Sequence, residues 1–250
     1  MKLGIDMGGM SIKMGLVNEE NKIIGRITIP TDLTVPYQTL VERMADAVRQ
    51  MLENAGMTLE QCGGIGIGSP GTIDAKQGVI LYSNNFGWEN VPIVEELKKH
   101  LDTRIEIAND ADAAALGEVC AGAAEGAENA VLLTLGTGVG SGVILDKKIF
   151  RGAMPGGCEL GHLSIRYDGI RCTCGRKGCL EAYASASALL RIAREKAAEH
   201  PESIMNEMCG NDLEQMNGKI PFDAAKAGDE AGMETVKEYE GYPVSYTHLR

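Results

Sequence analysis

The chain has 250 residues and a formal net charge of −11, with the hydrophobic (44%) and charged (24%) fractions of an ordinary globular protein. This acidic balance argues against binding to the phosphate backbone of nucleic acids, because no basic stripe could offset it. The opening residues lack the apolar core of a signal peptide, and the longest apolar stretch, residues 130–145, is broken by four glycines. Seven cysteines without a secretion signal are typical of reduced thiols. We therefore expect a cytoplasmic protein that binds no nucleic acid and spans no membrane.

Short apolar strands alternate with helices along the first half of the chain, and this alternation predicts an α/β fold. The expected strands cover residues 3–6, 12–17, 22–29, 65–68 and 104–108, and the expected helices cover residues 36–55, 93–101, 111–121 and 230–240.

Residues 3–17 and 131–145 form a weak internal repeat at an offset of 128 residues. Both segments read as apolar strand, polar residue, glycine turn and apolar strand, and Gly8 falls on Gly136. Two unrelated hairpins would give the same pattern. The alternative is a duplicated pair of domains whose facing hairpins hold one ligand, with residues 1–118 and 119–240 as the two domains.

Both glycine turns suit phosphate binding. Glycine lets backbone N–H groups approach an anion, and Asp6, just before the first turn, could hold Mg²⁺ through water. One such turn is more often structural, but two in one chain favour a nucleotide site. Neither is a P-loop or a dinucleotide fingerprint, because no Gly-Lys-Ser/Thr follows and the next element is a strand. The loops offer Asp6, Gly8, Gly9, Gly136 and Gly138 as candidate nucleotide-binding residues.

Asn109 and Asp110 follow an apolar strand and begin an alanine-rich helix. Either residue type caps a helix N-terminus well, which is the simpler interpretation. A carboxylate at the carboxyl end of a strand is also where an α/β fold places a catalytic base.

A histidine and three closely spaced cysteines give the strongest local signal. One imidazole and three thiolates form the closed ligand set of a structural zinc, although an unrelated group of reduced cysteines would look the same. Glu159 and Glu181 flank the cluster and could accept hydrogen bonds from paired hydroxyls of a polyol, or could lie in solvent. The candidate zinc ligands are His162, Cys172, Cys174 and Cys179.

These motifs, together with Gly68-Ser69-Pro70-Gly71, occur in the order found in the ROK family of sugar kinases and repressors, and the resemblance runs from about residue 3 to about residue 239. It implies an actin-like ATPase fold, with two ribonuclease H-like α/β domains and a cleft between them. It also implies ATP-dependent phosphorylation of a hexose. Residues 83–88 and 179–185 look most like the glucokinase branch, which implies glucose as the substrate.

The resemblance assigns roles by position. Asp110 matches the general base that takes the proton of the sugar 6-hydroxyl. The implied sugar contacts are Gly71, Thr72, Asn84, Asn109, Glu159, His162 and Glu181, and Ser11, Lys13 and Thr137 match positions that touch the ATP phosphates. Met10 departs from the threonine that is usual in the family, and Asp112 departs from the commoner asparagine. The implied cofactors are ATP, Mg²⁺ and a structural Zn²⁺, and we expect a homodimer when the protein is full length.

Three other functions stay open: a ROK repressor, a kinase for N-acetylmannosamine, mannose, fructose or allose, and a non-catalytic sugar-binding protein. A repressor would carry a helix-turn-helix before the first hairpin, and only five residues precede Asp6. Residues 241–250 fit no helical period and resemble a translated adapter sequence. We therefore expect that the chain is cut short before its C-terminal end and that this tail is not native.

Overall fold

A computed structural model describes residues 1–154, 156 and 158–247, with side chains described up to residue 243. The chain separates into two compact units, one of Met1–Leu132 with Gly142–Cys158 and one of Leu133–Ser141 with Glu159–Arg250. The predicted boundary after residue 118 separates two duplicated halves of the fold, which are a different division from these compact units. That boundary therefore stays a prediction. Strands and helices both contribute, which confirms the predicted α/β class.

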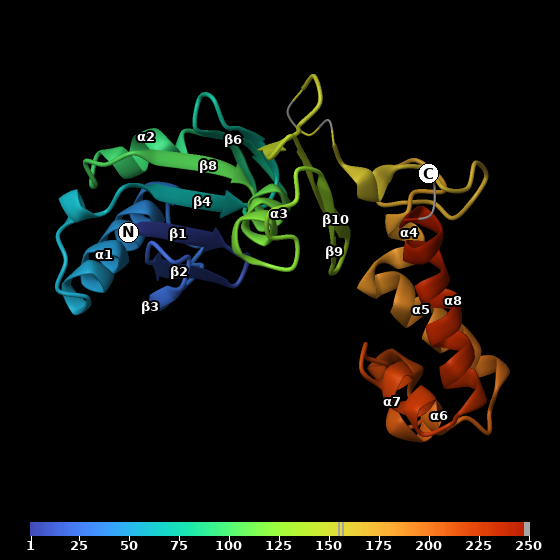
Figure 1. The fold of residues 1–250 in the computed structure, drawn as a ribbon. Coiled ribbons are helices and arrows are strands. Elements are labelled where there is room, and N and C mark those ends of the chain that lie inside the picture. The colour runs from blue at the N-terminus through green and yellow to red at the C-terminus, as the bar shows by residue number, and fades with distance from the viewer. Residues whose placement is uncertain (155, 157, 248–250) are drawn as a thin grey trace. The chain divides into compact units, whose positions relative to one another are not determined.

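A five-stranded sheet in the order β3-β2-β1-β4-β8 forms the centre of the first unit (Figure 1). Its strands are β1 (Lys2–Met7), β2 (Ser11–Val17), β3 (Ile23–Pro30), β4 (Ile65–Ser69) and β8 (Ile105–Asn109). β1, β4 and β8 run parallel, whereas β2 and β3 pair antiparallel with their neighbours. Leu3, Ile5 and Met7 alternate with exposed residues along β1, so that one face of the strand enters the core.

Helix α1 (Tyr37–Asn54) packs into the same core as the sheet, because its apolar residues recur on one face. The helix ends at Asn54, two residues before Gly56, whose φ of 66° suits the left-handed position after a helix C-terminus. The 3₁₀ helix η1 (Leu59–Gln61) follows, and α2 (Ile93–Lys98) adds Ile93 and Leu97 to the core.

The sequence did not predict a second, antiparallel sheet in the first unit. It consists of β5 (Thr72–Asp74), β6 (Val79–Ser83) and β7 (Trp88–Val91) in that order. Strands of three to five residues are too short to show a clear alternation of apolar and polar residues, so the sequence pattern did not indicate them.

The internal repeat corresponds to two strand–turn–strand segments. β9 (Ala130–Leu135) and β10 (Val139–Leu145) have the bounds of β1 and β2 shifted by the same 128 residues. β10 also pairs with β11 (Lys148–Ile149). Helix α3 (Asp110–Ala121) precedes this hairpin, as predicted.

Helices dominate the second unit. They are the 3₁₀ helix η2 (Leu160–His162), α4 (Glu181–Ala184), α5 (Ala186–Glu199), α6 (Ile204–Met208), the 3₁₀ helix η3 (Leu213–Gln215), α7 (Ile220–Lys226) and α8 (Glu230–Thr247). α8 runs along α5, and Leu189, Ile192 and Tyr239 form a shared apolar cluster (Figure 1).

Helix α8 continues beyond its expected end at residue 240 and includes Pro243. The Tyr239 hydroxyl donates to the Ala184 carbonyl at 2.9 Å, and the ring of Tyr242 lies 5.0 Å from that of Tyr183. Packing against α4 therefore outweighs the weak helix propensity of this segment. Residues 248–250 lie outside the described part, and the foreign origin of residues 241–250 stays a prediction.

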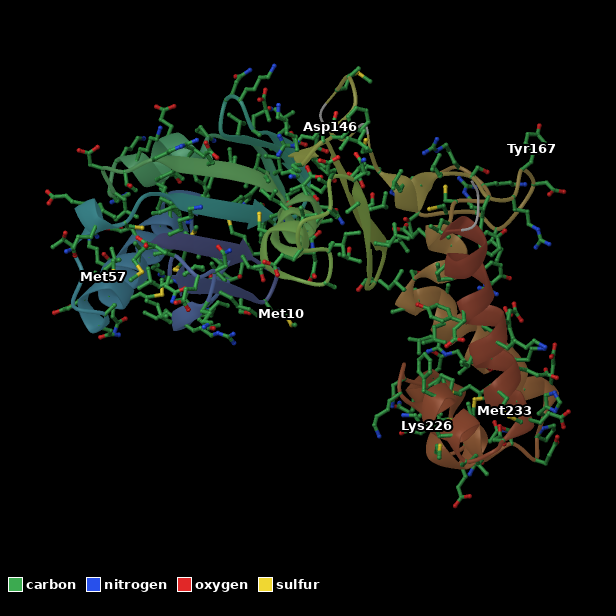
Figure 2. The ribbon with its side chains drawn as sticks, in the orientation of Figure 1. Met10, Met57, Asp146, Tyr167, Lys226 and Met233 are labelled. Atoms are coloured by element: carbon green, nitrogen blue, oxygen red, sulfur yellow. The ribbon has the colours of Figure 1, made fainter. Side chains whose placement is uncertain are left out.

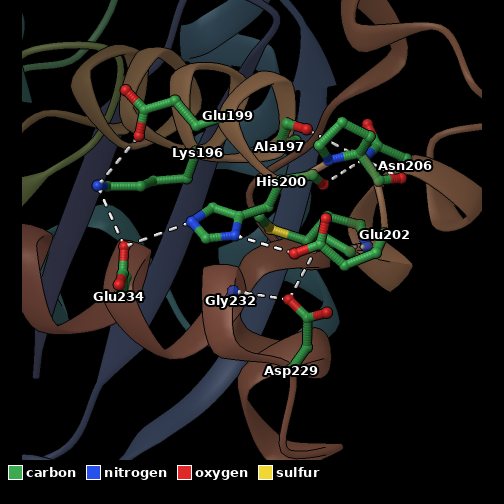
Figure 3. A network of polar contacts seen from close by, with 12 residues as sticks. Lys196, Ala197, Glu199, His200, Glu202, Asn206, Asp229, Gly232 and Glu234 are labelled. Atoms are coloured by element: carbon green, nitrogen blue, oxygen red, sulfur yellow. Dashed lines mark hydrogen bonds and ion pairs between the residues drawn. The ribbon is translucent and has the colours of Figure 1, made fainter.

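A polar network ties the end of α5 to α8 (Figure 3). Lys196 pairs with Glu199 at 3.3 Å and with Glu234 at 3.1 Å, and His200 Nδ1 lies 3.1 Å from Glu202. Among the described residues, none of the helices combines the length and apolar character that crossing a bilayer requires.

Candidate functional site

The predicted site residues of the first unit gather at the edge where the parallel strands end. Asp6 on β1 is in register with Gly68 on β4, and Ser69 at the end of β4 is in register with Asn109 on β8. Open α/β sheets bind ligands at this edge. The sheet therefore brings the first glycine turn, the residue 68–72 loop and the start of α3 to one side of the unit.

The first glycine turn is closed by its own backbone. Gly8 donates to the Ser11 carbonyl at 3.0 Å, and a Cβ on Gly8 would lie only 2.9 Å from that oxygen, so the turn requires glycine. Lys13 stands opposite Asp6 in the hairpin. Met10, at the tip, points away from the sheet and is 90% exposed (Figure 2).

Thr31 stabilises this turn, a role that no sequence motif indicates. Its hydroxyl donates to the Gly8 carbonyl at 2.6 Å, and its N–H donates to the Met10 carbonyl at 3.1 Å. Thr31 lies just after β3, and only the pairing of β2 with β3 brings it to the turn.

Asn109 caps α3, as the simpler interpretation predicts. Its Oδ1 accepts from the N–H groups of Ala111 at 2.9 Å and Asp112 at 3.3 Å. The amide group of the same side chain donates to the Gly71 carbonyl at 3.2 Å. Asp110 is the first residue of the helix, and its side chain is exposed.

The remaining predicted sugar contacts of the first unit lie beside this cap. Gly71 has φ = 111°, and a Cβ there would collide with the Tyr82 carbonyl. Thr72 pairs with Tyr82 across the small sheet, and exposed Asn84 follows the buried Ser83. Asn109, Gly71, Thr72 and Asn84 thus form one wall.

The four predicted zinc ligands come together in the second unit. Their ligand atoms all lie within 4.8 Å of one another, with 3.6 Å between the sulfurs of Cys174 and Cys179 and 3.6 Å between Cys172 Sγ and His162 Nδ1. Tetrahedral zinc, with bonds of about 2.3 Å to sulfur and about 2.0 Å to nitrogen, requires edges of about 3.8 Å and about 3.5 Å for these pairs. The ligand set therefore fits zinc.

The three thiols of the cluster ionise differently. A hydrogen bond from the Arg176 backbone N–H lowers the pKa of Cys174 to about 6, whereas burial raises that of Cys179 to about 12. Burial also raises the pKa of Cys172. A bound cation would favour the thiolate form of all three, so metal binding at this cluster would release protons.

Glu181 links the cluster to the second glycine turn. Its Oε2 accepts from the Val139 N–H at 3.1 Å, and its Oε1 accepts from the Thr173 hydroxyl at 2.9 Å and the Cys172 thiol at 3.4 Å. A Cβ on Gly138 would collide with the same carboxylate. This contact between a predicted sugar ligand and a predicted phosphate loop did not follow from the spacing of the motifs.

The start of α5 holds the second glycine turn in place. The Gly136 carbonyl accepts from the Ala186 N–H at 2.8 Å, and the Thr137 carbonyl accepts from the Ser187 hydroxyl at 3.2 Å. Gly136 also donates to the Gly138 carbonyl at 3.0 Å, which closes the turn.

Glu159 and His162 flank η2, which packs against the same hairpin. The His162 N–H donates to the Glu159 carbonyl at 3.0 Å, and a Cβ on Gly161 would collide with the Val139 carbonyl. Glu159 is exposed, and His162 Nδ1 lies 4.0 Å from Glu181 Oε1. The predicted sugar-binding residues therefore form two groups, one in each unit.

Comparison with known proteins identifies the family and the fold of the chain. The sequence model described as the ROK family matches residues 2–243. The chain is 38% identical over 228 residues to the glucokinase of Thermotoga maritima, an alignment that covers 91% of this chain and 70% of that protein.

Two solved structures are similar over 96% of the chain at 31% identity. One is a ROK family glucokinase from Streptomyces griseus in complex with glucose and AMPPNP (TM-score 0.76, 76% of that chain), and the other is a ROK hexokinase from Thermus thermophilus (TM-score 0.78, 74% of that chain). These likenesses confirm the predicted actin-like ATPase fold.

Proposed function

Because the chain belongs to the ROK family, we propose that it is an ATP-dependent hexokinase that phosphorylates glucose to glucose 6-phosphate. The observation that carries the proposal is the exposed carboxylate of Asp110 on a capped helix start, beside the wall of Gly71, Thr72 and Asn109. A base held in this way needs no rearrangement before it accepts a proton.

In the proposed reaction Asp110 accepts the proton of the sugar 6-hydroxyl, and the hydroxyl oxygen attacks the γ-phosphorus of ATP while ADP leaves. Phosphoryl transfer requires mainly positioning and charge neutralisation. The backbone N–H groups of the two glycine turns, with Ser11, Lys13 and Thr137, would bind the phosphates. Asp6 would hold Mg²⁺ through water, and the ion supplies neutralising charge.

Glu159, His162 and Glu181 are the proposed sugar ligands of the second unit. Zinc bound by His162 and the three cysteines would fix the loop that carries them, and this role is structural, because the four protein ligands fill its coordination. A zinc site of this kind requires reduced thiols, which fits the cytoplasmic location that we propose.

The test measures ADP release by the purified chain with ATP and a panel of glucose, mannose, fructose, allose and N-acetylmannosamine. Glucose should give the largest kcat/KM. Asp110→Asn should still bind glucose and lose a factor on the order of 10²–10⁴ in kcat. Asp102→Asn, which changes an exposed carboxylate of the same unit, is the control. Wild-type turnover by Asp110→Asn would overturn the assignment of the base.

A further inference from the structure

A second carboxylate lies in the first turn of α3, and it is buried. Asp112 is 7% exposed, two residues after Asp110, at a position where asparagine was expected. Burying a carboxylate costs free energy unless a cation and hydrogen bonds compensate it.

Arg151 is that cation. Its Nε donates to Asp112 Oδ2 at 3.0 Å. Arg151 follows β11, and the neighbouring strand β10 touches the same turn, since a Cβ on Gly142 would collide with the Ala111 carbonyl. The first turn of α3 is thus held on one side by the Asn109–Gly71 hydrogen bond and on the other by Arg151.

We propose that the Asp112–Arg151 ion pair is a positioning pair for the general base Asp110. The proposal rests on the proposed function. Within the described part of the chain, the Asp110 carboxylate makes one hydrogen bond: its Oδ1 accepts from the N–H of its neighbour Ala111 at 2.9 Å. The place of this carboxylate therefore depends on how firmly the turn is held. A displacement of about 1 Å at a reacting group can cost roughly 10²-fold in rate.

The pair also sets the charge around the base. Burial raises the pKa of Asp112, Arg151 lowers it, and the charge of Asp110 raises it further. Of the strands near this turn, β4 and β10 carry no ionisable side chain, β8 carries Glu106, which is paired with Arg104, and β11 carries Lys148. Removing Arg151 alone would leave the buried Asp112 carboxylate without its cation and would raise the pKa of Asp112.

The experiment compares wild type, Arg151→Gln, Asp112→Asn and the double variant in kcat and in the KM for glucose, so that an effect on turnover is separated from an effect on sugar binding. Arg151→Gln should lower kcat about 10- to 100-fold, with a smaller change in the KM for glucose, because the turn that carries Asp110 is held less firmly. Adding Asp112→Asn removes the uncompensated buried carboxylate and should restore only part of kcat. Arg151→Lys keeps a cation beside Asp112 and should keep most of kcat.

The pKa of Asp112 is measured in the same proteins by carboxyl carbon NMR, with Asp112→Asn identifying its signal. It should rise in Arg151→Gln, because the cation that lowers it is gone. Arg104→Gln, which breaks the exposed pair with Glu106, is the control. A folded Arg151→Gln protein whose kcat matches that of wild type would overturn the proposal. Wild-type protein that phosphorylates no sugar would instead sink the proposed function, whatever the NMR titration gives.

Discussion

Gly138 allows a direct test of the contact between the second glycine turn and Glu181. A methyl group at residue 138 would overlap the Glu181 carboxylate, which accepts the Val139 N–H at 3.1 Å. Gly138→Ala should therefore displace that carboxylate and break a hydrogen bond to a charged group, which contributes about 1.5–3 kcal/mol. Since about 1.4 kcal/mol is a factor of ten, and the turn must keep its shape to hold phosphate, the dissociation constant for ATP should rise about 10- to 100-fold.

Isothermal titration calorimetry with a non-hydrolysable ATP analogue measures this change without turnover. Gly136→Ala is the matched control in the same turn, because a Cβ at residue 136 meets nothing within 4 Å. Its effect on affinity should be much smaller. Equal losses in the two variants would refute the reasoning, since they would show that the Glu181 contact does not set the shape of the turn.

Three further outcomes follow from contacts described above. Cys174→Ser should reduce bound zinc well below about one ion per chain, because zinc then lacks one of its four ligands, and elemental analysis of protein purified without chelator measures it. Thr31→Val should lower the free energy of unfolding by about 1 kcal/mol in denaturant titrations, since the Gly8 carbonyl loses its donor. Glu202 raises the pKa of His200, so the stabilisation by this pair is full below the ordinary pKa of about 6.5 and is lost as pH rises through the raised value. His200→Gln should therefore lower the melting temperature near about pH 5.5 and leave it unchanged near about pH 8.5.

The matched controls are Cys120→Ser, Thr28→Val and His100→Gln. Each changes the same residue type outside the contact in question. A full zinc content in Cys174→Ser would contradict the role of this cysteine as a ligand. Equal unfolding free energies for Thr31→Val and Thr28→Val would contradict the Thr31 hydrogen bond. A change in melting temperature of His200→Gln that does not vary with pH would contradict the His200–Glu202 pair.

The sequence predicted the elements whose residues repeat regularly. The alternation in β1 and β2 and the apolar face of α1 give bounds within two residues of those observed, because burial on one face leaves a periodic trace. The three strands β5, β6 and β7 left no such trace. The predicted end of α8 at residue 240 was wrong. Tyr239 and Tyr242 pack against α4 and stabilise the helix, an effect that local helix propensity does not include.

Site residues were predictable where the chemistry is local in sequence. Cys172, Cys174 and Cys179 are close enough along the chain for one loop to bring their sulfurs together. Thr31 and Arg151 act on partners 23 and 39 residues away, across strand pairing that no motif encodes. Threonine and arginine occur throughout proteins in many roles. The role of such a residue is therefore recognised only when the fold shows which residue it contacts.

The division of the chain between the two units has a consequence for synthesis on the ribosome. Residues 133–141 belong to the second unit, yet residues 142–158, which follow them, complete the first. At about 5–20 residues per second, translating residues 133–158 takes about 1–5 s. Until residue 151 is added, the nascent first unit lacks Arg151, so the start of α3 has one of its two attachments. The segment that carries the proposed base would thus be among the last parts of its unit to become fixed during translation.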